Sequence, residues 1–183
     1  MEEIVKKEYI EGDETLVFAS TSVVKVVLLS LVTFGFYHII LVFSYWKQLK
    51  NNFGHKVSPF WRALFLGFSN FALFPIFEKY LNHFNQKVFN PAALAIIFFF
   101  CNGANNKISI KTMGVTEINW ALEIISWVLL IVMTIIFAVF QNKINLINEL
   151  NYPQAPKNPW KTSNTVWFVI CFLLLLIGYL PVE

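Results

Sequence analysis

The chain has 183 residues, of which 57% are hydrophobic and 14% are charged, and its mean hydropathy is +0.59. Soluble domains average about 45–50% apolar and about 25% charged residues, so this composition indicates a membrane protein that crosses the bilayer several times. The net charge is only +3, and the basic residues form no patch of the kind that reads nucleic acid. We therefore expect the lipid bilayer as a partner and no nucleic acid.

Residues 1–22 are predicted to be a polar N-terminal tail of mixed charge, in which Gly12-Asp13 permits a small hairpin. A cleavable signal peptide would begin with basic residues before a short apolar core, and these residues are mainly acidic. The first apolar segment is therefore expected to stay in the chain as a signal anchor.

Residues 23–183 are predicted to form a single transmembrane helical domain of the all-α class. The expected fold is a polytopic membrane helix bundle of four to five spans with a short interfacial helix. A helix rises 1.5 Å per residue, so about 20 apolar residues cross a hydrocarbon core of about 30 Å. The apolar segments cover about 23–46, 60–77, 91–104, 118–141 and 165–181.

The first segment, 23–46, carries a stripe of hydroxylated side chains that includes Thr33 and Tyr37. Such side chains let membrane helices approach and hydrogen-bond, so both are possible intramembrane polar partners. We expect His38 to be a packed histidine rather than a proton relay. Tyr45-Trp46, followed by lysines, is typical of the membrane edge.

The second segment, 60–77, opens at Ser58-Pro59, which favours a helix start. Arg62 and Asn70 are further possible intramembrane polar partners. Pro75 would kink or end the helix, so the segment either spans the membrane or is re-entrant. The amphipathic stretch 78–90 is predicted to be the interfacial helix.

The third segment, 91–104, is short for a span. A helix over these residues reaches about 21 Å, which is less than the hydrocarbon thickness. It crosses only if the bilayer thins or if the polar residues after it continue the helix. The last segment, 165–181, is expected to be capped by Thr162, Ser163 or Asn164.

The stretch 118–148 is the one around which the bundle is expected to form. On a helical projection its polar side chains fall within an arc of roughly 100°, opposite an aliphatic side that includes Ile125, Ile135 and Ile136 and is suited to lipid. We expect Thr116 to cap this helix. The polar seam consists of Asn119, Glu123, Ser126, Thr134, Gln141, Asn145 and Asn148.

Members of this seam favour different roles. Glu123 is an acid inside an apolar segment, which is a functional candidate by default, but its position near one end favours a structural or interfacial group. Gln141, Asn145 and Asn148 are expected to hydrogen-bond the end of the helix against a loop.

The sequence contains no recognisable catalytic pattern. The histidines are scattered, the two cysteines have no metal-ligand spacing, and no phosphate-binding or nucleophile motif is present. We therefore predict no catalytic residue, no metal, no cofactor and no enzymatic activity.

Orientation depends on the second segment. If 60–77 does not cross, residues 46–90 and 141–164 share one side, and the positive-inside rule favours that side as cytoplasmic with both termini outside.

Several short motifs resemble a group of small bacterial multi-spanning membrane proteins of unknown function, which carry a T-[FL]-G-x-Y motif in the first helix. Here they read Thr33-Phe34-Gly35-Phe36-Tyr37 before Tyr45-Trp46-Lys47, then Ser58-Pro59-Phe60-Trp61-Arg62, and the spacing of Gln141, Asn145 and Asn148. His38-Ile39 departs from the group, which more often has an acid or a polar residue there. The resemblance implies a multi-pass protein of the bacterial inner membrane and supplies no activity.

Two functions remain open. The first is a non-enzymatic protein that binds lipid, a membrane protein partner or a second copy of itself through the polar seam and the cytoplasmic loops. The alternative is a small transporter or channel-like protein with a polar path along the 118–148 helix, lined by Glu123, Ser126, Thr134 and Arg62.

Overall fold

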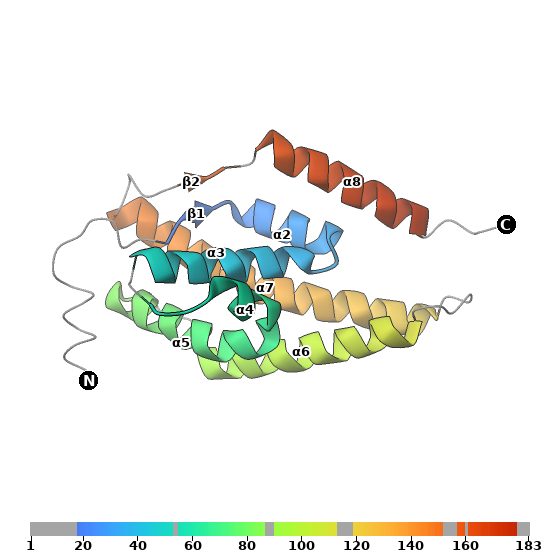
Figure 1. Cartoon of the computed structure of the whole chain (residues 1–183), viewed down its shortest axis with the longest axis horizontal. Helices are drawn as coiled ribbons and strands as arrows, with labels where there is room; N and C mark the ends of the chain where they lie inside the picture. Colours follow the sequence, from blue (N-terminus) through green and yellow to red (C-terminus); the bar gives the residue numbers. More distant parts are fainter. Residues whose placement is uncertain are drawn as a thin grey trace.

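A computed structural model of the chain describes residues 18–52, 55–86, 90–112, 119–151, 157–159 and 161–178. These residues form seven helices and one pair of two-residue strands, so the all-α prediction is confirmed (Figure 1). The possible hairpin at Gly12-Asp13 lies outside the described residues. The elements are β1 (Ser20–Thr21), α2 (Val23–Val32), α3 (Phe36–Asn52), α4 (Pro59–Leu64), α5 (Leu66–His83), α6 (Pro91–Thr112), α7 (Trp120–Asn151), β2 (Lys157–Asn158) and α8 (Thr162–Gly178).

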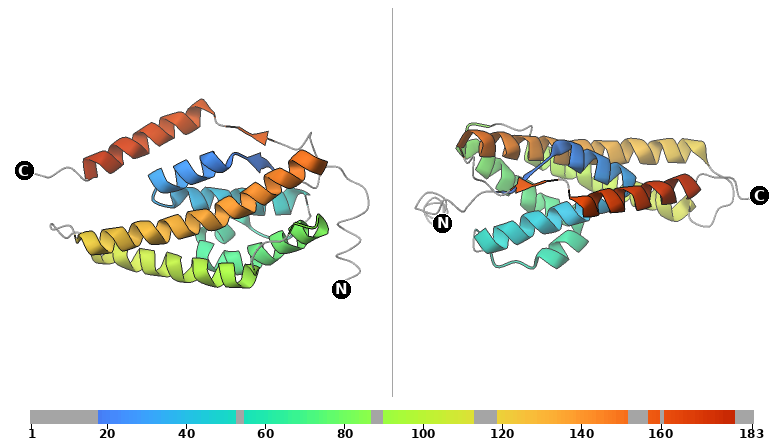
Figure 2. Two further views of the ribbon diagram at one scale, coloured as in Figure 1. Left: turned by 180° about the vertical axis from the view of Figure 1, so that it is seen from behind. Right: turned by 90° about the horizontal axis from the view of Figure 1, so that it is seen from above.

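Helix α7 runs the length of the molecule, with α6 beside it (Figure 2). Its 32 residues extend about 48 Å at 1.5 Å per residue. Among the described helices, α7 is the one that is long and apolar enough to cross a membrane. Val23–Val32 and Thr162–Leu173 are apolar but shorter.

The prediction of one helix over 23–46 is wrong, because the chain reverses between α2 and α3. Phe34 and Gly35 have φ angles of 50° and 85°, in the left-handed region. The N–H of Gly35 donates to the Ser30 carbonyl (2.8 Å) and that of Phe34 to the Leu31 carbonyl (3.2 Å), a Schellman helix end. Helices α2 and α3 therefore form an antiparallel hairpin, as all views show (Figures 1 and 2).

The segment 60–77 is divided at Phe65 into α4 and α5. Helix α5 does not end at Pro75 but continues to His83, because a proline removes one backbone hydrogen bond while Leu73, Phe74 and Phe77 around it are buried. The stretch 78–90 therefore does not form a separate interfacial helix: its first residues are the last turns of α5, and 87–89 lie outside the described residues.

Helix α6 is longer than the apolar run that begins it. Its 22 residues include the polar stretch from Asn102 onward, so of the alternatives for this segment the polar end continues the helix, to about 33 Å. The Asn90 side chain caps its first turn by accepting from the N–H groups of Ala92 and Ala93 (3.0 and 3.3 Å).

The two C-terminal helices begin with asparagine side chains. Asn119 Oδ1 accepts from the Leu122 N–H (3.2 Å), so Asn119 is the N-cap of α7; Thr116 lies outside the described residues. At α8, the Lys161 N–H donates to Asn164 Oδ1 (2.9 Å), which is the reciprocal half of a capping box.

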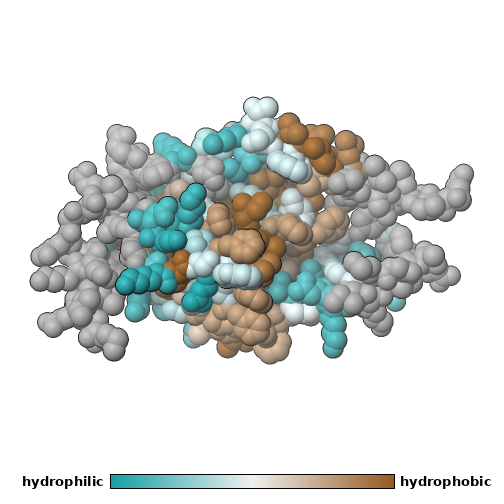
Figure 3. All heavy atoms as spheres, viewed as in Figure 1, coloured by the Kyte–Doolittle hydropathy of each residue, from teal (hydrophilic) through white to brown (hydrophobic). Residues whose placement is uncertain are grey.

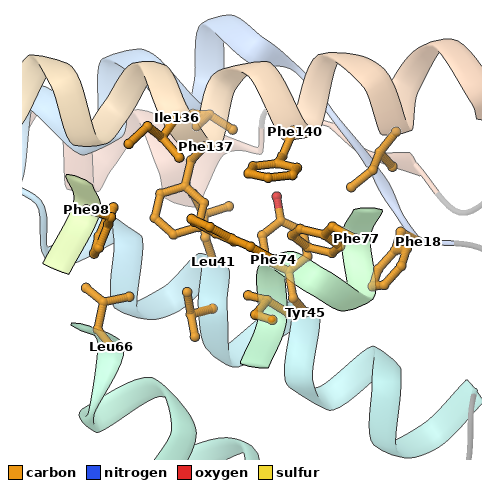
Figure 4. Packing of buried hydrophobic residues seen from close by; sticks show 14 of the residues in the cluster. Phe18, Leu41, Tyr45, Leu66, Phe74, Phe77, Phe98, Ile136, Phe137 and Phe140 are labelled. Carbon is orange, nitrogen blue, oxygen red and sulfur yellow. The ribbon is translucent and has the colours of Figure 1, made fainter. Parts of the chain in front are cut away.

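Aromatic side chains from α5, α6 and α7 fill the centre of the bundle (Figure 4). Phe74 lies 4.7 Å from Phe140 between ring centroids, and Phe98 lies 5.3 Å from Phe137. Each such pair adds about 0.5–1.5 kcal/mol beyond the area that it buries. Ile136, which the helical projection assigned to the lipid side of α7, is 5% exposed and belongs to this core. The reason is that both α6 and α2 pack on α7, and together they cover more of its circumference than the polar side alone.

Candidate functional site

The C-terminal part of the predicted polar seam holds the segment 18–21 against the last turns of α7. This part consists of Gln141, Asn145 and Asn148. Asn148 Nδ2 donates to the Phe18 carbonyl and to Ser20 Oγ (both 2.7 Å). Asn145 accepts from the Thr21 N–H (3.1 Å) and donates to the Thr21 carbonyl (2.8 Å). The side-chain amide of Asn145 thus pairs with one residue as a neighbouring strand would.

Gln141 joins this contact to α3. Its Nε2 donates to the Ala19 carbonyl (3.3 Å) and to Asn145 Oδ1 (2.9 Å), while its Oε1 accepts from the Tyr45 hydroxyl (2.7 Å). From α3, Gln48 Oε1 accepts from the Ala19 N–H (2.6 Å). Gln141 is fully buried, and every polar atom of its side chain is bonded, as burial requires. We call Gln48, Gln141, Asn145 and Asn148 the amide cluster.

Phe18 anchors the held segment. Its side chain is 0% exposed and meets the rings of Phe77, Tyr80 and Tyr45 edge-on at centroid distances of 5.0, 5.1 and 6.1 Å. Figure 4 shows Phe18 beside Phe77 at one side of the aromatic core. Residues 18–22, which the sequence analysis assigned to a tail, are therefore an integral part of the packed structure.

The connection to α8 covers the other side of the same segment. Ser20 and Thr21 pair in parallel with Lys157 and Asn158, and Lys25 Nζ donates to the Pro159 carbonyl (3.1 Å). The strand β1 is thus held by side-chain amides on one side and by main chain on the other.

The amide cluster hydrogen-bonds mainly to backbone groups of the segment 18–21. Apart from Ser20 Oγ, its bonds to the segment go to the carbonyls of Phe18, Ala19 and Thr21 and to the N–H groups of Ala19 and Thr21. Neutral amides are poor acids, bases and nucleophiles, so this arrangement is suited to binding an extended peptide rather than to catalysis.

The N-terminal part of the polar seam also contacts neighbouring helices. Thr134 Oγ1 lies 3.3 Å from His38 Nε2 of α3, and both side chains are buried. The Ser126 hydroxyl donates to Asn105 Oδ1 of α6. Glu123 is half-buried, and Asn119 is exposed and used as the helix cap.

Of the other predicted polar partners, Thr33 and Tyr37 are joined by a hydrogen bond, whereas Arg62 and Asn70 bond to none of the set among the described residues. Arg62 is exposed on α4, with its guanidinium carbon 4.9 Å from the centre of the Trp46 ring. Asn70 is fully buried on α5, and neither atom of its amide has a hydrogen-bond partner among the described residues. The Thr33 hydroxyl donates to the Leu29 carbonyl (2.6 Å) and accepts from the Tyr37 N–H (2.9 Å), so it fixes the hairpin turn.

The sequence did not predict three features of the packed structure. These are the burial of Phe18, the bond of Gln48 to the segment 18–21, and the bond from Trp46 Nε1 to Ser69 Oγ (2.6 Å). Gln48 lies three residues after Tyr45, so it shares that helix face, and this spacing was the available signal. Phe18 carries no such signal, because it lies in a short mixed segment.

No group of three or more histidine, cysteine, aspartate or glutamate side chains lies close enough to hold a metal ion in the part of the chain that the structure describes. Comparisons with protein-family models, with curated proteins and with solved structures find no match.

Proposed function

We propose that this chain is a polytopic, non-enzymatic membrane protein that binds a lipid or a membrane protein partner through its apolar exterior. The observation that carries the proposal is the set of large aromatic and aliphatic side chains exposed on the outside of the bundle. On α4 and α5 the exposed side chains include Phe60, Trp61, Leu64, Phe65, Phe68 and Phe71. An exposed apolar surface of this size marks a membrane or protein interaction site.

The location of this binding surface differs from the expectation. The amide cluster is occupied by the chain's own residues 18–21, and Thr134 and Ser126 pair with α3 and α6. The polar seam therefore holds the bundle together, and the surface left for a partner is apolar.

The distribution of hydrophobic residues supports a membrane position. On the face seen in Figure 3, hydrophobic residues lie across the middle and at the upper right, and hydrophilic residues gather on the left and at the lower right. Helices α6, α7 and α8 run along that axis, so we propose that these three cross the bilayer.

In this arrangement α2–α3 and α4–α5 are re-entrant hairpins. Residues 18–21 meet the last turns of α7, and Lys143 of α7 donates to Gln86 after α5 (3.2 Å). The turn at Gly35 instead lies against Leu130, which is nearer the start of α7. A Cβ atom added to Gly35 would lie 3.2 Å from Leu130 Cδ1. Both hairpins therefore enter and leave at the end of the bundle that holds residues 141–151.

We call this end the lysine-rich end, since eight lysines of the described residues lie there against Lys107 and Lys111 at the opposite end. The positive-inside rule assigns the lysine-rich end to the cytoplasm, and we propose a bacterial inner membrane, as the resemblance implies. The N-terminal segment is then cytoplasmic, contrary to the expectation of both termini outside. The eight are Lys25, Lys47, Lys50, Lys56, Lys79, Lys143, Lys157 and Lys161.

Site-specific photocrosslinking tests the binding surface. A photoreactive phenylalanine analogue in place of Phe68, which is 67% exposed, is expected to crosslink lipid or another membrane protein in intact membranes. The same analogue at Phe74, which is 0% exposed, is the matched control and is expected to form no intermolecular product. Equal products at both positions, or release of the chain from membranes by alkaline carbonate, would contradict the proposal.

One observation favours the transporter or channel-like alternative. Asn70 is buried in α5 without a hydrogen-bond partner in the described residues, and so is Ser30 Oγ in α2. A buried amide without a partner costs about 1–3 kcal/mol, which a polar solute passing through the bundle would offset. Flux of ions and small solutes into liposomes that Asn70→Leu abolishes, in a chain that still folds, would support this function; absence of flux in the unaltered chain would exclude it.

A further inference from the structure

The stretch from the end of α3 to the start of α4 carries four cations in a long part of the sequence that has no acid. Lys47, Lys50, Lys56 and Arg62 are all exposed, and no aspartate or glutamate occurs between residues 15 and 77 of the sequence. Among the described residues, none of these four side chains forms an ion pair or a hydrogen bond. Within the described part of the chain, no carboxylate compensates their charge.

Packing of α4 on α3 places Arg62 over Trp46 of α3. The Arg62 guanidinium lies over the Trp46 ring at 4.9 Å, and the Trp46 indole is fixed from below by its bond to Ser69 Oγ (2.6 Å). This cation–π contact leaves the edges of the guanidinium free to donate. Lys47 and Lys50 lie on the same stretch of α3 as Trp46, so the Trp46 contact holds Arg62 on the part of α3 that carries both lysines.

The same short helix presents aromatic rings next to the cations. Phe60 and Trp61 are 59% and 57% exposed and contact each other edge-on at 5.4 Å, and Trp61 stacks on Phe65 at 6.3 Å. Exposed tryptophan beside arginine and lysine is typical of the membrane–water interface. A soluble anion would use the cations and leave these rings in water.

We infer that the α3–α4 connection binds the headgroup phosphate of an anionic phospholipid. Arg62 and Lys47 donate to the phosphate, and Phe60 and Trp61 contact the glycerol and the upper acyl chain of the same lipid. The inference rests on the proposed membrane location. It specifies which lipid binds to the exposed surface of α3 and α4 at the lysine-rich end. Both phosphatidylcholine and phosphatidylglycerol offer the phosphate, but a choline ammonium would lie among these cations, and residues 15–77 contain no carboxylate to pair with it; the glycerol of phosphatidylglycerol carries no charge.

Native mass spectrometry of the full chain tests this assignment, with phosphatidylglycerol or phosphatidylcholine added to the same detergent. The unaltered chain is expected to retain phosphatidylglycerol preferentially. Replacement of Lys47 and Arg62 by glutamine is expected to lower that retention about fivefold for each charge removed. The matched control, Lys107→Gln with Lys111→Gln, removes the same charge from the opposite end and is expected to leave retention unchanged.

Other outcomes overturn the inference. Equal retention of both lipids, or equal loss in both double variants, would mean that no site exists here. Binding of glycerol phosphate without acyl chains would identify a free-anion site, and a doubled mass that Trp61→Ala abolishes would identify a second copy as the occupant. A chain that resists carbonate extraction but shows no lipid preference overturns this inference alone, whereas release by carbonate overturns the proposed function as well.

Discussion

Gln141 is the residue on which the contact between α3, α7 and the segment 18–21 depends. Replacing it by alanine leaves the Tyr45 hydroxyl and the Ala19 carbonyl without their partner. A buried polar group that loses its partner costs about 1–3 kcal/mol, so we expect Gln141→Ala to lower the free energy of unfolding by that amount. Thermal unfolding in detergent would measure it, and Asn142→Ala, at the exposed neighbouring position, is the control. Equal midpoints for the two variants would show that the amide cluster contributes nothing.

At this scale the sequence predicted the kind of contact but not its partner. Gln141, Asn145 and Asn148 fall on one side of a helix, and their role in binding a nearby segment followed from that spacing. The segment itself lies more than 120 residues away along the chain, and nothing in local periodicity marks Phe18 as its anchor. A side-chain amide pairs equally well with any main chain, so the identity of its partner depends on the tertiary fold.

The α2–α3 turn is the element that separates the observed fold from a simple bundle of spans. No proline, aspartate, glutamate, lysine or arginine interrupts residues 26–46, and hydropathy therefore predicts one helix over 23–46. The information lies in Gly35, whose φ of 85° is accessible to glycine and costs other residues about 1–2 kcal/mol. A glycine in an apolar segment is also common within membrane helices, which is why the turn was not predicted.

Two glycine substitutions test this turn. We expect Gly35→Ala to destabilise the fold by about 1–2 kcal/mol, because of its backbone conformation and because the new Cβ would lie 3.2 Å from Leu130 Cδ1. Gly103→Ala is the matched control, since Gly103 is within α6 and no atom lies within 4 Å of an added Cβ. That substitution is expected to stabilise by about 0.5–1 kcal/mol. The same sign of change at both positions, measured by thermal unfolding, would argue against a strained turn at Gly35.

For the whole molecule, the hairpins decide on which side of a membrane the N-terminal segment lies. A single span over 23–46 would separate residue 22 from residue 50 by the bilayer. The hairpin places both at the lysine-rich end, because Gln48 bonds to Ala19 and Asn145 bonds to Thr21. Lys107 lies on the other side in this arrangement, near the exit of α6.

Single cysteines distinguish the two arrangements in a chain whose Cys101 and Cys171 are replaced by serine. We expect Ser22→Cys and Lys50→Cys to react with a membrane-impermeant maleimide from the same side of sealed vesicles, and Lys107→Cys from the opposite side; all three positions are exposed. The reason is that α6 crosses the bilayer once between residues 90 and 107, whereas α2–α3 returns to its starting side. Labelling of Ser22→Cys together with Lys107→Cys, and apart from Lys50→Cys, would restore a continuous first span and refute the re-entrant hairpin.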